Sequence, residues 1–228
     1  MKDDKPKQQG RVENTTGNGM SMAMLLQAEI YTGDLRAIDK KLFKTGPINE
    51  ADVLQLKSVL VTLANVRDFE ATARFTYREY HLPSTIYKPL RKHFDLAKYL
   101  RNKFVGHMHP ELLAQALERS PLVSKILPSS RDRQMMVLIN LWLLETAINT
   151  YVEEDGQHKV FDTVPDLLYP PEWEHFGSFM LSAIDGAMEY LKLLREYWGP
   201  KVALIPPAHT TREEIATAGR QRYKYLTQ

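Results

Sequence analysis

The sequence predicts an all-α protein, a bundle of four to five long helices with at most a minor extended segment near residues 158–164. Apolar residues recur three and four positions apart over several long stretches, which is the period of an amphipathic helix. Proline and glycine separate these stretches and leave short connections, an arrangement typical of helix bundles. The alternation of apolar and polar residues that marks a half-buried strand is almost absent.

Composition places the chain among ordinary globular proteins. It has 228 residues, of which 43% are hydrophobic, enough for a sizeable core. The formal net charge of +2 is too small to indicate a nucleic-acid-binding protein from bulk charge, so such binding would require a local basic patch. The chain has no cysteine, which excludes disulfides, thiolate metal sites and cysteine nucleophiles.

No segment predicts a membrane association. The longest apolar stretch, residues 135–144, is far shorter than the ~20 residues that cross a bilayer. The first ten residues are charged and contain no apolar core of a signal peptide. We therefore expect a cytoplasmic protein.

The chain divides into three expected parts: a disordered leader over 1–19, a helical bundle over 20–198 and a C-terminal tail over 199–228. The first helix is expected over about 20–44, since glycine and proline follow at positions 46 and 47. These two residues disfavour continuation of the helix.

The second helix has a well-defined start. Asn49 can cap its free amides, and Glu50 and Asp52 suit the positive end of the helix dipole. The apolar positions that follow at helical spacing are Val53, Leu56, Leu60 and Leu63. The pattern extends the helix to about Tyr80.

The third helix is expected to start within residues 84–89, because Pro89 is tolerated without cost only in a first turn. Gly106 weakens the helix and Pro110 forces the preceding residue out of helical geometry. The helix is therefore expected to end at about His107.

Three further helices complete the prediction. They cover a short segment at 111–119, a segment at about 131–153 that is apolar nearly all round over 135–144, and a long segment at about 171–198. Apolar residues of the last one recur by three and four without a slip, at Trp173, Phe176, Met180, Ala183, Ala187, Leu191, Leu194 and Trp198.

The residues most suited to chemistry lie at the end of the third helix, in the segment Arg101-Asn102-Lys103-Phe-Val-Gly-His107. A guanidinium binds phosphate through forked, charge-assisted hydrogen bonds. A histidine can accept and donate protons at neutral pH, and the Asn102 amide can hold either group in place. No metal ion is required if the nucleophile is the 2′-hydroxyl of an RNA substrate.

The spacing within this segment limits how its groups can meet. Six residues at ~100° each place Arg101 and His107 about 120° apart on an ideal α-helix. The two side chains therefore share a site only if the helix end redirects His107 or if a second chain completes the site.

The same segment resembles the R-polar-x(3–5)-H signature of HEPN domains, most closely the R-[N/D]-K-x-x-[small]-H form of the abortive-infection branch. This resemblance implies a helical bundle and a metal-independent ribonuclease that acts as a homodimer. It gives Arg101 the role of phosphate ligand, Asn102 that of supporting polar residue and His107 that of catalytic histidine. It also implies a setting in phage defence or a toxin–antitoxin pair, with a cognate antitoxin protein as a possible partner.

Basic residues around the segment predict contacts to RNA. The third helix carries Lys88, Arg91, Lys92, Lys98, Arg101 and Lys103. Of the residues near the motif, Lys98, Lys103 and His109 are the candidate RNA-binding residues. The alternation of basic and aromatic residues at 220–225 could also bind phosphates and stack bases, although a solvated tail is the simpler interpretation.

Two other functions remain open at this stage. The first is a non-catalytic helical module that binds protein or nucleic acid and uses Arg101 and His107 structurally. The second is a metal-dependent hydrolase with ligands His93, His107 and His109. The carboxylate nearest to the last two, Glu111, lies beyond Pro110, and none of these histidines has a carboxylate at helical spacing within its own helix, so we expect neither a metal ion nor another cofactor.

Overall fold

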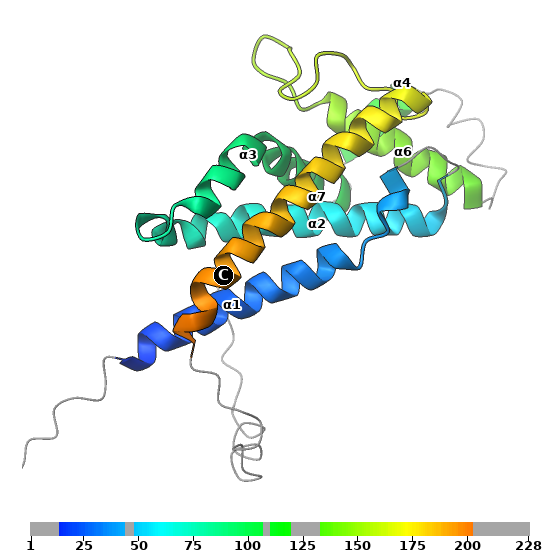
Figure 1. Ribbon diagram of the computed structural model, residues 1–228. Coiled ribbons are helices and arrows are strands. Elements are labelled where there is room, and N and C mark those ends of the chain that lie inside the picture. Colours follow the sequence, from blue (N-terminus) through cyan, green and yellow to red (C-terminus); the bar gives the residue numbers. More distant parts are fainter. Residues whose placement is uncertain (1–13, 44–47, 107–109, 120–132, 203–228) are drawn as a thin grey trace, which may run out of the picture.

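The computed structural model describes residues 14–43, 48–106, 110–119 and 133–202 (Figure 1). Within these ranges the chain is mainly α-helical and contains no strand, so the predicted all-α class is confirmed, although residues 150–169 form a long connection where short ones were expected. The six α-helices of the described residues are α1 (Asn14–Arg36), α2 (Glu50–Ala73), α3 (Leu82–Leu100), α4 (Pro110–Arg119), α6 (Arg133–Asn149) and α7 (Pro170–Trp198).

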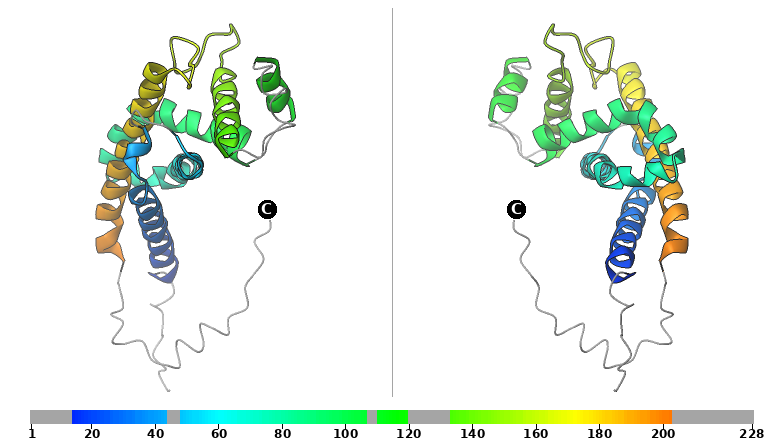
Figure 2. Two further views of the ribbon diagram at one scale, coloured as in Figure 1. Left: turned by 90° about the vertical axis from the view of Figure 1, so that its right-hand side faces the viewer. Right: turned by 90° about the vertical axis from the view of Figure 1, so that its left-hand side faces the viewer.

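The bundle is built around α2. This helix packs against α1, α3, α6 and α7, and α7 in turn packs along α1 and α3. Figure 2 shows α4 and α6 at one end of the molecule, with the start of α1 and the end of α7 at the opposite end. The end of α3 lies beside α2 and α6, away from the start of α1.

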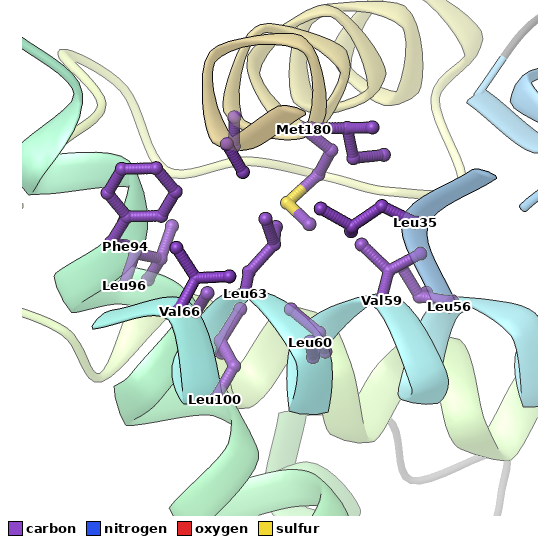
Figure 3. Close-up of a cluster of buried hydrophobic side chains, with 14 of the residues drawn as sticks. Leu35, Leu56, Val59, Leu60, Leu63, Val66, Phe94, Leu96, Leu100 and Met180 are labelled. Atoms are coloured by element: carbon purple, nitrogen blue, oxygen red, sulfur yellow. The ribbon is translucent and has the colours of Figure 1, made fainter. Parts of the chain in front are cut away.

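A single hydrophobic cluster joins these helices (Figure 3). Leu60 and Leu63 of α2 are fully buried and face side chains of α1, α3 and α7. All eight apolar residues of the predicted stripe on the last helix are buried, which confirms the face assigned from the sequence. Burial of apolar area of this kind is the main favourable contribution to the free energy of folding.

The capping residue expected for α2 is present. The Asn49 side chain accepts hydrogen bonds from the amides of Ala51 and Asp52, while the Asp52 carboxylate accepts one from the Asn49 amide. This reciprocal pair is a capping box, which satisfies amides that the first turn leaves free. The helix ends earlier than expected, because the segment Arg74–Arg78 tightens into a 3-10 helix (η2) before Tyr80.

The start of α3 differs from the prediction. The helix begins at Leu82, so Pro89 lies well inside it instead of in its first turn. Pro89 and Thr85 are both exposed to solvent. The Thr85 carbonyl, which receives no amide hydrogen bond from Pro89, therefore faces water, and this reduces the cost of an internal proline.

The last part of the expected third helix is not α-helical. From Arg101 to Gly106 the chain forms a π-helical turn (η3), in which the hydrogen bonds span one residue more than in an α-helix. Phe104 is buried and fixes this turn to the core. His107, where the helix was expected to end, lies outside the described residues.

The remaining bounds follow the expected pattern with local shifts. α1 begins at Asn14, within the expected leader, and ends at Arg36, followed by a short 3-10 helix (η1, Lys40–Phe43). The proposed extended segment amounts to one isolated antiparallel bridge, between Val152 and His158. None of the described helices has the length and apolar character needed to span a membrane.

Candidate functional site

The predicted motif lies where α3 passes into the π-helical turn. The Arg101 side chain is 25% exposed, whereas Asn102 and Lys103 extend into solvent. Phe104, on the inner side of the same turn, is buried, and the Lys57 ammonium lies 5.0 Å from the centre of its ring. The turn therefore places the Arg101 guanidinium at the protein surface with its stem packed against the bundle.

Three oxygen atoms hold the Arg101 guanidinium. Its Nε donates to Oδ1 of Asn102 at 3.1 Å. Its Nη1 lies 3.4 Å from Oδ1 of Asn65 and 3.3 Å from Oδ2 of Asp68. Asn65 and Asp68 are three residues apart on α2 and so lie on one face of that helix. These contacts orient the fork, and none of the hydrogen bonds between described residues uses Nη2.

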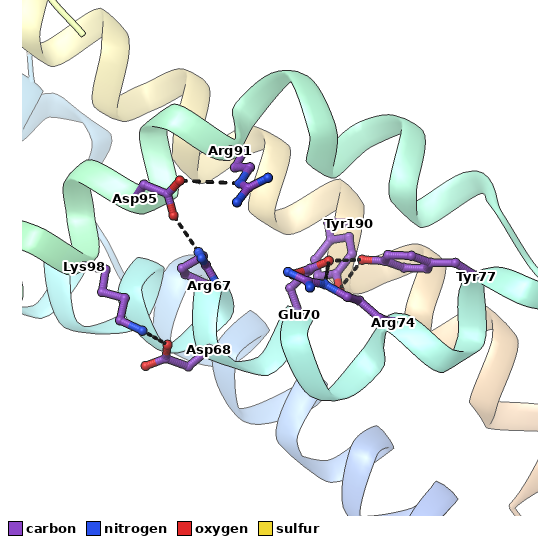
Figure 4. A network of polar contacts seen from close by, with 9 residues as sticks. All are labelled: Arg67, Asp68, Glu70, Arg74, Tyr77, Arg91, Asp95, Lys98 and Tyr190. Carbon is purple, nitrogen blue, oxygen red and sulfur yellow. Dashed lines mark hydrogen bonds and ion pairs between the residues drawn. The ribbon is translucent and has the colours of Figure 1, made fainter. Parts of the chain in front are cut away.

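Asp68 is shared between two cations. The Lys98 ammonium donates to Oδ1 of Asp68 at 2.5 Å, and Arg101 contacts the other oxygen (Figure 4 shows the Lys98 contact). Burial alone would raise the pKa of the Asp68 carboxyl, but the hydrogen bond and charge of Lys98, with those of Arg101, lower it. One negative charge thus faces two positive charges, and this cluster keeps an excess positive charge at neutral pH.

Part of the predicted basic patch on α3 is neutralised. Asp95 accepts a hydrogen bond from Nε of Arg67 at 2.6 Å and lies 3.5 Å from Nε of Arg91 (Figure 4). The Asp95 carboxylate raises the pKa of Arg67 through this hydrogen bond. Three exposed lysines of the patch have no ion pair within the described part of the chain: Lys88, Lys92 and Lys103.

Four of the six predicted site residues are therefore placed. The structure brings Arg101, Asn102 and Lys98 together around Asp68, and it sets Lys103 in the same turn with its side chain in solvent. His107 and His109 lie outside the described residues. Their positions relative to Arg101 stay predictions.

The candidate metal ligands are placed only in part. His93, on α3, stacks on Phe179 of α7 with ring centres 3.9 Å apart, and burial lowers its pKa. No cluster of three or more histidine, aspartate or glutamate side chains suited to a metal ion occurs among the residues that the structure describes.

Asn65 and Asp68 are the site residues that the sequence did not indicate. They belong to α2, whose apolar spacing marks it as a core helix, and no motif connects them to Arg101 across more than thirty residues. The available signal was the polar content of one stretch of α2. Four polar or charged residues within 65–70 follow the more apolar stretch 59–64 of this helix.

A second polar network lies further along α2. The Glu70 side chain is buried and accepts hydrogen bonds from Nε and Nη2 of Arg74 at 2.8 Å each (Figure 4). The Tyr77 hydroxyl lies 3.3 Å from Glu70 and 3.0 Å from the hydroxyl of the fully buried Tyr190. Burial raises the pKa of both tyrosines. This network joins α2, η2 and α7, and its enclosure suits stabilisation of the fold.

Comparisons with known proteins give no relative. No protein-family profile, curated protein or solved structure matches the chain.

Proposed function

We propose that the protein is a metal-independent RNA endonuclease of the HEPN type that acts as a homodimer. The observation that supports this most directly is the Arg101 guanidinium, which α2 and Asn102 orient at the surface beside a second cation, Lys98. A fixed, partly exposed guanidinium in a positively charged cluster suits a phosphodiester. A π-helical turn is also a local irregularity that occurs frequently at functional sites.

The proposed reaction is an internal transesterification of RNA. The 2′-hydroxyl oxygen forms a bond to the adjacent phosphorus, and the bond from phosphorus to the 5′-oxygen of the next nucleotide breaks. His107 accepts the proton of the 2′-hydroxyl as a general base. It then donates a proton to the leaving 5′-oxygen as a general acid. Arg101 stabilises the negative charge that develops on the phosphate oxygens. The products are a 2′,3′-cyclic phosphate and a 5′-hydroxyl.

Other residues of the cluster contribute to binding in this proposal. Asn102 orients Arg101, and Lys98, Lys103 and His109 contact the RNA backbone. The second chain of a homodimer supplies a second copy of the motif facing the first. The setting is cytoplasmic, in phage defence or a toxin–antitoxin pair with a cognate inhibitor protein.

A non-catalytic module is the second candidate. The observation in its favour is that Arg101 and Lys98 are already paired with Asp68, as in an ordinary structural ion-pair cluster. Such a module would bind RNA or a protein through the exposed lysines and would cleave nothing.

Incubation of the purified protein with a labelled single-stranded RNA in excess EDTA tests the proposal. We expect cleavage in EDTA, fragments with 2′,3′-cyclic phosphate ends, and loss of cleavage in Arg101→Ala and in His107→Ala. Matched controls are Arg91→Ala, an exposed arginine on the same helix, and His81→Ala, an exposed histidine before it. Both controls should cleave like the parent protein.

The other outcomes identify the alternatives. Retained RNA binding without cleavage supports the non-catalytic module. Cleavage that EDTA abolishes and a divalent metal ion restores supports a metal-dependent hydrolase. Cleavage that persists in both Arg101→Ala and His107→Ala refutes the assigned site.

A further inference from the structure

One face of α1 carries apolar and small residues that no described part of the chain covers. Leu26 and Ile30 are 54% and 61% exposed, although both are large and apolar. The exposed positions on this face alternate at spacings of four and three: Gly19, Ala23, Leu26, Ile30, Gly33 and Ala37. Strict alternation of this kind is the pattern of a helix that packs against another helix. We call these six residues the α1 stripe.

The opposite face of α1 already packs on the bundle. Met24, Ala28, Thr32 and Leu35 are buried there. The α1 stripe is therefore a second packing face, and its small residues permit a partner helix to approach the backbone closely.

The size of the α1 stripe decides whether its partner is a separate chain or a segment of the same chain. It extends over about 27 Å of helix and is about 10 Å wide. Two such faces would bury roughly 600 Å², which is below the ~1,200 Å² typical of a stable complex between separate chains. A segment tethered to the same chain needs less area, because a short tether supplies an effective concentration in the millimolar range.

The C-terminal residues of this chain are tethered beside α1. The last described element, the 3-10 helix Gly199–Lys201 (η4), contacts α1, and residues 203–228 follow it. Their sequence contains Thr211-Arg-Glu-Glu214, a capping-box pattern that predicts the start of a helix. Apolar or small residues then recur at helical spacing, at Ile215, Gly219, Tyr223 and Leu226.

The direction of α7 determines how this segment would meet α1. Arg195 pairs with Glu29 at 2.8 Å and Lys40 pairs with Asp185, so α7 runs antiparallel to α1. Residues 203–210 can span up to about 28 Å, enough to reverse the chain. A segment that returns over α1 consequently runs from the beginning of α1 toward its end.

Charge favours this direction. The segment has Glu213 and Glu214 at its start and three cations, Arg220, Arg222 and Lys224, in its second half. α1 has its acidic residues, Glu29 and Asp34, in its own second half. In the parallel direction the cations of the segment lie in the same half as the acids of α1.

We propose that residues 211–226 form a helix that docks on the α1 stripe of the same chain. In the resulting register Gly219 lies opposite Leu26 and Tyr223 lies near Ile30, so a small residue faces a large one at the centre. This docking is independent of the proposed nuclease site, which lies at the far end of the bundle.

Cysteine cross-linking in the full-length protein tests the docking, because the natural chain contains no cysteine. The test pair is Leu26→Cys with Gly219→Cys. The matched control is Leu26→Cys with Gln221→Cys, which has nearly the same tether length but lies on the opposite side of the expected helix. We expect an intramolecular disulfide in the monomer that forms about tenfold faster for the test pair than for the control.

Two results would overturn the proposal. Equal rates for the two pairs would mean that the segment collides with α1 without docking. The second result is a disulfide-linked dimer in place of the intramolecular bond, joined through position 26 of two Leu26→Cys chains. It would mean that a second copy of the chain covers the α1 stripe. Asp34→Lys provides an additional measurement: it should slow the cross-link of the test pair several-fold while the circular dichroism spectrum stays unchanged.

Discussion

Replacement of Gly177 by alanine should destabilise the protein, although alanine is the better helix former. Gly177 lies inside α7, where η1 packs against it. A Cβ atom at this position would overlap the carbonyl oxygen of Phe43 and would lie 3.1 Å from the Cβ of Phe43 and 3.2 Å from its carbonyl carbon. All three are atoms of the backbone or directly attached to it, so no side-chain rotation relieves the contact, and the two elements must move apart.

Two opposing contributions set the magnitude. Overpacking of a close contact costs about 1–3 kcal/mol. The change from glycine to alanine in a helix interior contributes about 1 kcal/mol in the other direction. Because the contacted atoms cannot rotate away, the overpacking cost falls in the upper part of its range, about 2–3 kcal/mol. The expected net loss is then about 1–2 kcal/mol, which for a protein of this size lowers the melting temperature by about 2–8 °C.

Thermal unfolding followed by circular dichroism measures this change, with urea unfolding as a second measurement. Gly199→Ala is the matched control, because Gly199 has helical backbone angles at the end of α7 and a Cβ there meets nothing within 4 Å. This control should gain up to about 1 kcal/mol, so the two variants should shift in opposite directions. A Gly177→Ala protein that melts at or above the parent temperature would refute the packing argument.

Two further predictions concern the polar clusters of α2. The Asp68 carboxyl has a lowered pKa in the folded protein, so its contribution to stability is present above the pKa of about 4 found in unfolded chains and is lost as pH falls through the lower folded value. Asp68→Asn should therefore weaken the dependence of the unfolding free energy on pH below pH ~4, measured by urea unfolding. It should also reduce RNA cleavage, because Arg101 loses one of its supporting contacts. An unchanged pH dependence would contradict the role of Asp68 in stability. Arg74→Met should cost about 2–3 kcal/mol, which is less than the ~3–5 kcal/mol for breaking a fully buried pair, because Glu70 is 4% exposed but Arg74 is 55% exposed. The double variant Glu70→Gln/Arg74→Met should recover part of this loss in urea unfolding, because it no longer buries an unpaired charge. If Arg74→Met costs less than about 0.5 kcal/mol, the pair behaves as a surface ion pair and the prediction is wrong.

Periodicity was sufficient to predict the class of the fold and the buried face of its longest helix. The reason is that the buried face of α7 depends on which side chains avoid water, and this is visible in the spacing of Trp173 to Trp198. The start of α2 was predictable because a cap acts locally, through the Asn49 side chain and the amides next to it.

Features that depend on neighbouring elements were not predictable in this way. Pro89 is tolerated inside α3 because it and Thr85, whose carbonyl it leaves without an amide partner, lie on the exposed face of the helix. The sequence alone does not indicate which face of the helix meets water at that point. The π-helical turn at 101–106 depends on how Phe104 reaches the core across α2 and α6. Tertiary contacts of this kind override local preference.

The candidate site shows the same division. The motif identified Arg101 and Asn102 because they lie side by side in the sequence. The supporting Asn65 and Asp68 come from α2, and only the packing of α2 against α3 brings them to the guanidinium. A lone polar residue on a core helix gives no indication of which distant side chain it will meet.

The π-helical turn has a consequence for how the chain tolerates insertions and deletions. Such a turn is equivalent to an α-helical turn with one inserted residue. Deletion of a single residue within 101–106 would therefore let α3 continue with regular α-helical winding, while the residues on either side keep nearly the same faces. The extra residue widens the backbone at the position from which the Arg101 side chain extends, so a one-residue deletion there should displace the guanidinium from Asn65 and Asp68 while the bundle itself keeps its fold.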